Sequence, residues 1–310
     1  MHRRSDAMTR RAFLTATSAA AMAAAATSRM TLGAAAEPTA PPVCVFSKHL
    51  EHLDYEDLAR TCRELGLDGV DLTVRGGGHV EPAHVETDLP RAVEAIRAEG
   101  LDVPMITTRL LDGDDPTARP ILTVAAEQGI GCFRCGWYRY DETTHPMEQV
   151  RAFTERLAGL TKVAEECGIA GAYHNHSSMR DVGGPLWDLY LMLAEIDSPY
   201  MGASFDVGHA KADGGAGAWP TNTRLLAPYT QALAVKDVRW HEGRVQWVPL
   251  GDGWVDLTAS LRIFHDSGFN GPISLHFEYP TESREVLLEH MADANAKLRQ
   301  AMADAGYPAS

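Results

Sequence analysis

Residues 171–176 read Gly-Ala-Tyr-His-Asn-His, a short apolar run that ends in two histidines one residue apart. If this run is a strand, His174 and His176 point to the same face, because side chains alternate along a strand. Three later segments also end in polar side chains: Ser204-Phe205-Asp206, Val235-Lys236-Asp237 and His276-Phe277-Glu278. Four strand ends whose polar groups converge are typical of the active-site face of an α/β barrel.

Eight short apolar segments alternate with eight segments of helical pattern along the chain. The expected strands cover residues 43–46, 69–73, 103–107, 132–135, 171–176, 201–205, 232–235 and 272–277. The expected helices cover residues 54–65, 89–99, 117–128, 147–167, 186–195, 222–226, 256–265 and 283–302. This repeat of roughly 30 to 40 residues predicts a single TIM (β/α)8 barrel. A doubly wound open sheet is the alternative, but its polar groups would gather at one switch point rather than at nearly every strand end.

The first 36 residues resemble an export signal rather than a part of the fold. Residues 9–14 (Thr-Arg-Arg-Ala-Phe-Leu) resemble the twin-arginine motif, an alanine-rich run covers residues 19–26, and residues 34–36 form an A-x-A type cleavage site. The apolar run is too short to span a membrane. We therefore predict a signal peptide over residues 1–36, a single barrel domain over residues 37–310, and export by the twin-arginine route to the periplasm or another extracytoplasmic space. The alternative is a disordered basic leader.

Charge and cysteine content exclude several classes of protein. The formal net charge is −14 at pH 7, and the leader holds five arginines and one aspartate, so the predicted domain is more acidic than the whole chain. Such a charge disfavours nucleic acid and anionic membrane as partners. The five cysteines are irregularly spaced, and the lone C-x-x-C pair, Cys132 and Cys135, lies in an apolar run. We expect buried thiols there rather than a disulfide scaffold.

Polar side chains at the expected strand ends form the candidate site: Asp71, Thr73, Arg75, Thr107, Thr108, Arg134, His174, His176, Asp206, His209, Lys236, His276 and Glu278. Each could instead be an ion pair or a hydrogen-bonded core residue, but their gathering at one end of a barrel favours a functional role. His174, Asp206 and Glu278 could supply one nitrogen and two carboxylates to a divalent cation. That mixed set suits Mn²⁺, Zn²⁺ or Fe²⁺ better than Ca²⁺.

Tryptophans cluster in the segment 237–256, which holds Trp240, Trp247 and Trp254. Their rings could stack on a sugar or could seal the loops against the barrel. The residues assigned to substrate binding are Asp71, Arg75, Arg134, His276 and Trp240.

Six short motifs follow one another along the chain: residues 69–72 (Gly-Val-Asp-Leu), 173–176 (Tyr-His-Asn-His), 205–209 (Phe-Asp-Val-Gly-His), 235–237 (Val-Lys-Asp), 251–256 (Gly-Asp-Gly-Trp-Val-Asp) and 274–278 (Ser-Leu-His-Phe-Glu). In this order they resemble those of the sugar phosphate isomerase/epimerase family, the xylose isomerase-like TIM barrels. Members of that family hold a divalent metal with Glu, Asp, His and Glu, and they move protons beside a sugar carbonyl through an enediolate. The resemblance implies that Asp206 and Glu278 are metal ligands and that His209 contacts substrate.

Two positions depart from the family's metal set. His174 stands where the first glutamate is expected, and Ala234 stands where the histidine is expected, with Lys236 nearby. Either a changed set holds the metal, or Lys236 supplies the positive charge without one. The changed set would be His174, Asp206 and Glu278, with His176 or His276 as a fourth ligand.

Of the family's two metal-bound glutamates only Glu278 remains, and this bears on the reaction. Epimerisation in the family uses acids on both faces of the enediolate, whereas isomerisation or β-elimination beside a keto group needs one base. We predict an exported sugar isomerase or epimerase whose catalytic residues are Glu278, His176, His209 and Lys236. The alternatives are a lyase that cleaves 3-keto-glycosides by elimination and a barrel that binds a sugar without turning it over. The expected partner is a small sugar or glycoside, and a homo-oligomer is also considered.

Overall fold

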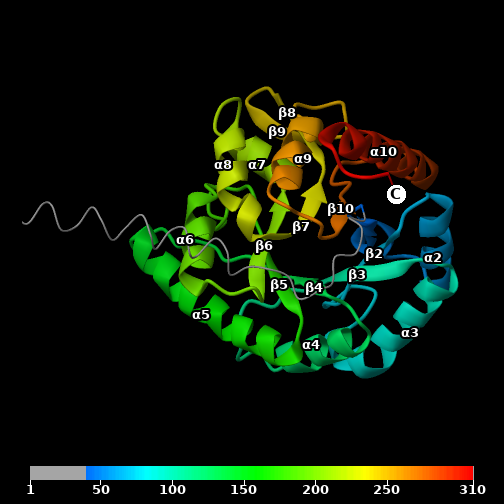
Figure 1. The fold of residues 1–310 in the computed structure, drawn as a ribbon, viewed down its shortest axis with the longest axis horizontal. Coiled ribbons are helices and arrows are strands. Elements are labelled where there is room, and N and C mark those ends of the chain that lie inside the picture. Colours follow the sequence, from blue (N-terminus) through cyan, green and yellow to red (C-terminus); the bar gives the residue numbers. More distant parts are fainter. Residues whose placement is uncertain (1–39, 310) are drawn as a thin grey trace, which may run out of the picture. The chain divides into compact units, whose positions relative to one another are not determined.

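The computed structural model describes residues 40–309. Eight parallel strands close into a barrel in the order β1-β10-β7-β6-β5-β4-β3-β2, and helices lie outside it (Figure 1). The strands are β1 (Val43–Phe46), β2 (Gly69–Thr73), β3 (Asp102–Thr107), β4 (Cys132–Arg134), β5 (Ala170–His174), β6 (Met201–Asp206), β7 (Thr230–Val235) and β10 (Ile273–Leu275). The predicted TIM barrel is confirmed. The predicted signal peptide lies outside the described residues.

The predicted helices are present as α2 (Tyr55–Glu64), α3 (Val85–Ala98), α4 (Ala118–Glu127), α5 (Pro146–Cys167), α6 (Trp187–Ile196), α8 (Trp219–Leu226), α9 (Leu257–Asp266) and α10 (Arg284–Ala305). Side-chain oxygens of Asp54, Asp256 and Ser283 accept backbone N–H groups in the first turns of α2, α9 and α10. Gly168, with φ 75°, ends α5 in the left-handed conformation that glycine adopts without strain. Helix α3 begins four residues before the predicted start and accommodates Pro90 in its second turn.

Two further features follow strands β6 and β7 and were not predicted. Helix α7 (Val207–Gly214) begins directly after β6, where the Asp206 carboxylate accepts the backbone N–H of His209 at 2.8 Å. An antiparallel hairpin of β8 (Asp237–His241) and β9 (Arg244–Val248) follows β7 and packs against α7. Both lie at the carboxyl ends of the strands, so they add side chains to the face where the candidate site is expected. Short 3₁₀ segments are η1 (Ser47–Leu50), η2 (Pro82–His84) and η3 (Ala227–Tyr229).

The barrel interior is filled in layers. A small apolar cluster contains Cys44, Met105, Cys132, Ala172 and Ala232. Two residues further along β3, β4 and β5 the inward positions are the polar Thr107, Arg134 and His174, so the floor of the candidate site is apolar and part of its wall is polar. The larger apolar cluster fills the space between strands and helices.

The cysteines of the described chain are free thiols, and four of the five are buried. Burial raises the pKa of Cys132 and of Cys135, to about 12 for the latter, so neither thiol is ionised at neutral pH. These thiols are packing residues, as expected from the sequence. Within residues 40–309 the search for a helix long and apolar enough to cross a membrane finds none.

Candidate active site

Lys236 is the centre of the polar cluster at the carboxyl end of the barrel. Its Nζ lies 2.6 Å from Oε2 of Glu278, 2.7 Å from Nε2 of His209 and 3.2 Å from Oδ2 of Asp206. The same ammonium lies 4.2 Å from the centroid of the Trp247 ring. The Lys236 side chain is 2% exposed, so these contacts replace its hydration shell. The sequence predicted that Lys236, His209 and Glu278 act together, and the structure brings them into direct contact.

The ammonium decides the charge state of the Glu278 carboxylate. Burial alone raises the pKa of Glu278, but the charge of Lys236 and its hydrogen bond outweigh burial and lower that pKa to about 2. Burial raises the pKa of the neighbouring Asp206 carboxyl, and Lys236 opposes that rise. Glu278 is therefore ionised at neutral pH and is a weak base. Its side chain is 23% exposed, so solvent and small ligands can reach it.

His174, His209 and His276 are buried imidazoles beside these charges. Burial lowers the pKa of each one well below its usual value, and the positive charges of Arg134 and Lys236 lower each further. All three rings are therefore neutral at neutral pH, and Nε2 of His209 accepts a hydrogen bond from the Lys236 ammonium. Nδ1 of His209 lies 2.6 Å from the Ser177 hydroxyl, which fixes the plane of that ring.

His176 forms a dyad with a carboxylate that the sequence analysis missed. Nδ1 of His176 lies 2.8 Å from Oδ2 of Asp181, an ion-pair distance at which neither atom has the alignment of a hydrogen bond within residues 40–309, and Oδ1 of Asp181 accepts Nε–H of Arg139 at 2.9 Å. The His176 ring stacks on Trp137, with centroids 4.6 Å apart and planes 9° apart. Burial lowers the pKa of His176, Lys236 lowers it further and Asp181 opposes both. A neutral imidazole held by a buried carboxylate, 26% exposed at the side chain, has the form of a general base.

Asp237 holds Lys236 and the hairpin in place. The Asp237 carboxylate is buried and accepts backbone N–H groups of Val238, Gly251, Gly253 and Val255 at 2.7 to 3.0 Å. A Cβ at Gly253 would lie 2.2 Å from Oδ1 of Asp237, so this position has room for glycine alone. The glycine-rich motif at residues 251–253 therefore binds the side-chain carboxylate of Asp237 through its backbone N–H groups.

Arginines line the other side of the barrel mouth. The guanidinium of Arg134 lies 4.9 Å from the centroid of the Phe46 ring, and that of Arg75 lies 5.3 Å from the same centroid. Arg75 pairs with Glu51 at 3.6 Å. Asp71 accepts the hydroxyls of Thr107 and Ser274 at 2.7 and 2.8 Å, and its pKa is raised by burial. These side chains come from strands β1 to β4 and β10.

The tryptophan at the site is Trp247 of β9. It contacts Lys236 and packs edge-on against His209 with ring centroids 4.8 Å apart. Trp240, which the sequence analysis assigned to substrate binding, lies on β8 and is 42% exposed. Sequence spacing alone could not distinguish the two, because alternate residues of both hairpin strands share a face. A separate groove of about 560 Å³ between α8 and α9, lined by Trp219, Arg224 and Arg262, contains none of the predicted site residues.

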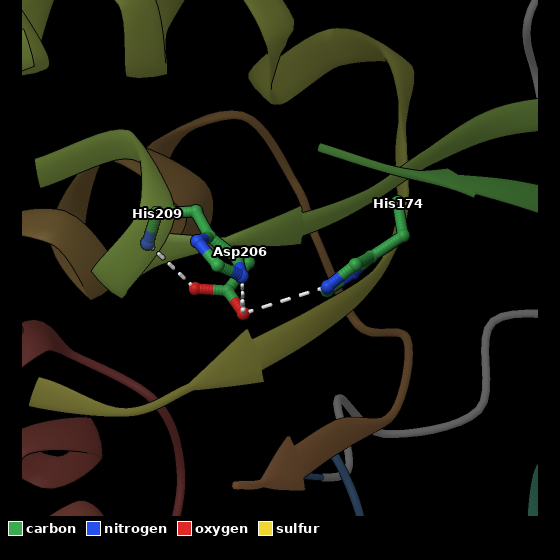
Figure 2. Close-up of side chains that lie close together, drawn as sticks. All are labelled: His174, Asp206 and His209. Atoms are coloured by element: carbon green, nitrogen blue, oxygen red, sulfur yellow. Dashed lines mark hydrogen bonds and ion pairs between the residues drawn. The ribbon is translucent and has the colours of Figure 1, made fainter. Parts of the chain in front are cut away.

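Three buried side chains could hold a metal ion. Ligand atoms of His174, Asp206 and His209 all lie within 4.8 Å of one another, and Figure 2 shows the Asp206 carboxylate between the two rings. Oδ2 of Asp206 lies 3.6 Å from Nε2 of His174 and 3.9 Å from Nε2 of His209, and the Lys236 ammonium lies 3.2 Å from it. Two neutral imidazoles and a carboxylate are ligand types that suit a divalent transition ion, at a place where the ammonium now lies. This set shares His174 and Asp206 with the predicted one, but it has His209 in place of Glu278, whose Oε2 is bonded to Lys236.

A comparison with protein families matches residues 59–303 to the family described as Xylose isomerase-like TIM barrel. The chain belongs to this family. The match begins within α2 and ends within α10, and it confirms the family that the motifs resemble.

Comparisons with individual proteins agree with the fold. A curated relative, the uncharacterized protein MJ1311 of Methanocaldococcus jannaschii, is 23% identical over 151 residues, which are 46% of this chain and 50% of the relative. This chain thus matches about half the length of that relative. A xylose isomerase-like TIM barrel protein from Mycobacterium smegmatis, solved in complex with magnesium, is similar with a TM-score of 0.68 at 17% identity, covering 86% of this chain and 97% of the other. The 3-keto-D-glucoside 4-epimerase YcjR from E. coli is similar with a TM-score of 0.65 at 16% identity, covering 84% and 99%.

Proposed function

We propose that this chain is an enzyme of the sugar isomerase or epimerase kind, which moves a proton on the carbon beside the carbonyl of a small sugar. One observation supports this most strongly: the buried Lys236 ammonium lies in contact with Asp206, His209 and Glu278, and a His–Asp dyad lies in the adjoining loop. The rings of His176 and His209 are 4.2 Å apart, so the dyad and the ammonium face the same space. A cation beside a neutral base is the arrangement that proton abstraction next to a carbonyl requires.

The proposed steps use this chain's own residues. Lys236 donates a hydrogen bond to the carbonyl oxygen, which replaces its longest contact, the 3.2 Å contact with Asp206. His176 takes the proton from the neighbouring carbon, and the electron pair of that C–H bond moves toward the oxygen to form an enediolate. Lys236 stabilises the negative charge. Return of the proton from His176 to the former carbonyl carbon, with the proton of the neighbouring hydroxyl passing to the enediolate oxygen, gives an isomer. Protonation of the original carbon on its opposite face needs a second acid on that face, which His176 then balances by keeping the first proton, and gives an epimer.

Glu278 has a different part in this proposal. A carboxyl with a pKa of about 2 is a poor proton carrier at neutral pH, so we assign the proton transfer to His176 and not to Glu278. Glu278 fixes the position of the ammonium through the 2.6 Å hydrogen bond. It also keeps Lys236 charged in a buried site.

A divalent ion is compatible with this proposal. His174, Asp206 and His209 would hold it, and when bound it would polarise the carbonyl oxygen as a Lewis acid. The Lys236 ammonium contacts two of those three residues, so the ammonium must move toward Glu278 for an ion to be held. The similar structure with magnesium supports testing this possibility with Mg²⁺, Mn²⁺ and Zn²⁺.

Cleavage of a 3-keto-glycoside by β-elimination is the second candidate. It is favoured by the absence of a second ionised carboxylate at the position of His174, because elimination needs one base and a group that protonates the leaving oxygen. The similar structure of a 3-keto-D-glucoside 4-epimerase supports including keto-glycosides among the substrates tested.

Product analysis distinguishes these reactions. The purified protein is incubated with ketoses and with 3-keto-glucosides, and products are followed by NMR and mass spectrometry. A product of unchanged mass supports the isomerase or epimerase, and a released aglycone supports the lyase. Binding without conversion contradicts both and leaves a sugar-binding barrel. His176→Gln should lower the rate of conversion by about 10²- to 10³-fold, whereas His241→Gln, at an exposed hairpin position, should leave it unchanged.

We also propose that the protein is exported by the twin-arginine route, on the basis of its first 36 residues. Replacement of Arg10 and Arg11 by lysine should retain the protein in the cytoplasm of a host that has this route. Unchanged export of that variant would contradict the proposal.

A further inference from the structure

Around the Phe46 ring lie buried hydrogen-bond donors that have no acceptor. The His276 ring stacks on Phe46 with centroids 4.7 Å apart, and the guanidiniums of Arg134 and Arg75 lie over the same ring. Nε of Arg134 and both ring nitrogens of His276 are buried and, within residues 40–309, have no hydrogen-bond partner. Arg134 is 4% exposed and His276 is 3% exposed. An imidazole ring always carries at least one N–H, so the structure buries two unpaired donors in one place.

Leaving such donors unpaired is costly. A buried donor without an acceptor destabilises the folded state by about 1–3 kcal/mol, and more when it carries a charge. Asp71 does not relieve Arg134, because its oxygens are occupied by Thr107 and Ser274, and no ion pair joins Asp71 to Arg134 among the described residues. A ligand that offers only acceptor atoms would satisfy both donors.

The charges nearby favour an anionic ligand. Arg75 is 11% exposed at its side chain, and Arg109 lies near enough to lower the pKa of Arg75 further, after the larger effect of burial. The only acid paired with Arg75 in the described chain is Glu51, at 3.6 Å. This arginine group lies beside the reactive residues, since the His276 and His174 rings are 5.9 Å apart. An anion bound there would therefore belong to the same molecule as the reacting carbonyl.

We propose that Arg134, His276 and Arg75 form a subsite for a carboxylate, and that the substrate is a sugar acid rather than a neutral sugar. This inference rests on the proposed function, because it concerns the substrate of that site. A planar carboxylate matches the fork of a guanidinium and accepts from an imidazole N–H. A carboxylate carries one negative charge, whereas a phosphate carries nearly two and would lie near the carboxylates of Asp71, Asp206 and Glu278.

Binding measurements test the subsite without requiring turnover. Calorimetry and thermal unfolding compare glucose, glucuronate, gluconate and glucose 6-phosphate with the wild-type protein. We expect both acids to bind about 10- to 100-fold more tightly than glucose and to raise the unfolding temperature. Equal affinity for glucose and the acids would overturn the inference. Tighter binding of glucose 6-phosphate than of the acids would overturn the choice of carboxylate.

Two arginine variants locate the effect. Arg134→Met should remove the preference for acids over glucose, and Arg75→Met, at the partly exposed position, should reduce it about 10-fold. Arg119→Met is the matched control, because Arg119 pairs with Glu166 between α4 and α5 and should leave the preference unchanged. If Arg134→Met does not fold, Arg75→Met is the test. An unchanged preference of Arg75→Met for sugar acids over glucose would contradict the subsite.

The outcomes for the subsite and for the proposed function are separable. Acid-selective binding without conversion of any keto-sugar would leave the subsite and contradict the enzyme. Conversion of neutral keto-sugars without a preference for acids would leave the enzyme and contradict the subsite.

Discussion

The two sides of the barrel mouth differ in whether their buried charged groups have hydrogen-bond partners. On the side of β5, β6 and β7, Lys236 has a partner for every hydrogen it can donate, in Glu278, His209 and Asp206. On the side of β1, β2 and β4, Arg134 stacks on Phe46 and leaves its buried Nε without an acceptor in the described chain. The first arrangement is complete in the absence of a ligand, as expected for groups that carry out the reaction. The second is incomplete, as expected for groups that receive part of a substrate.

Replacement of Lys236 should have the largest effect on the rate of conversion and on stability. It should leave the arginine side of the barrel mouth unchanged. Lys236→Met removes the cation that contacts both Asp206 and Glu278, and it leaves Glu278 only the longer 3.8 Å contact with Lys48 among the described residues. We expect conversion to fall by about 10³-fold or more and the free energy of unfolding to fall by about 3–5 kcal/mol. Steady-state kinetics and denaturant unfolding measure both, with Lys162→Met on the outer face of α5 as control. The Lys236→Met variant should still bind sugar acids more tightly than glucose. Loss of that preference would contradict the division of the barrel mouth into two sides.

Replacement of His176 should lower the rate without affecting the fold. His176→Gln keeps a polar side chain at the position but removes the base, so kcat should fall by about 10²- to 10³-fold. Asp181→Asn should have a smaller effect, about 10-fold, because it leaves the imidazole and removes the charge that orients it. In both variants KM and the affinity for sugar acids should change little. A large change in KM with kcat unchanged would show that His176 binds substrate instead.

Replacement of Gly253 tests how the Lys236 side is held. Gly253→Ala places a Cβ 2.2 Å from Oδ1 of Asp237, and we expect a loss of about 1–3 kcal/mol in the free energy of unfolding. Gly76→Ala, in the loop after β2 on the arginine side, is the control, because the nearest atom to its Cβ would be 4.0 Å away. Chemical denaturation measures both. Equal losses would show that Asp237 does not hold the hairpin rigidly.

Replacement of His49 should have the smallest effect, visible only as the pH is lowered. Nε2 of His49 accepts the backbone N–H of Phe277 at 2.9 Å, and burial lowers its pKa to about 3, with Glu278 opposing and Lys48 adding to the shift. Between pH 6.5 and about 3 the unfolded chain binds a proton at this residue that the folded chain does not. The free energy of unfolding should therefore fall as the pH falls through that window, by up to about 1.4 kcal/mol per unit for this residue.

The pH profile needs matched variants, because five other histidines in the described chain also have lowered pKa values: His79, His174, His176, His209 and His276. His49→Gln can still accept the Phe277 N–H, so its stability should decline less steeply below pH 6.5 than that of the wild-type protein. The exposed residue His84, changed to glutamine, should leave the profile unchanged. Parallel profiles of the wild-type protein and His49→Gln would contradict the assignment.

The sequence predicted the barrel because its signals are local. Each strand is a short apolar run, and helices α2, α5, α9 and α10 begin with capping side chains, so the repeat is visible without any tertiary information. Helix α7 was missed because its sequence, from Val207 to Gly214, contains two glycines and little apolar periodicity. Its start depends on the Asp206 side chain, which was assigned to the site alone. The hairpin was missed although Val238 and Trp240 alternate with polar residues and Gly243 provides a turn.

Contacts between distant loops could not be predicted in the same way. The partner of His176 is Asp181, which reaches it only because the loop after β5 folds back on itself. Trp247 and Trp240 share a face of the hairpin, and Trp247 contacts Lys236 because it pairs with Val238 near the base of the hairpin, whereas Trp240 pairs with Val245 near its tip. The unpaired donors of Arg134 and His276 are visible only when every possible acceptor has been placed.

The central claim is that His176 removes a proton beside a carbonyl while Lys236 holds the oxygen. Exchange of that proton with solvent tests it most directly. The wild-type protein and His176→Gln are incubated in D₂O with 3-keto-glucose and with its uronic acid counterpart, and NMR follows deuterium at the carbons beside the carbonyl. The account predicts enzyme-dependent exchange at one of these carbons, faster for the acid and lost in His176→Gln. Equal exchange in the variant, or none above the buffer rate with a substrate that binds, would contradict it.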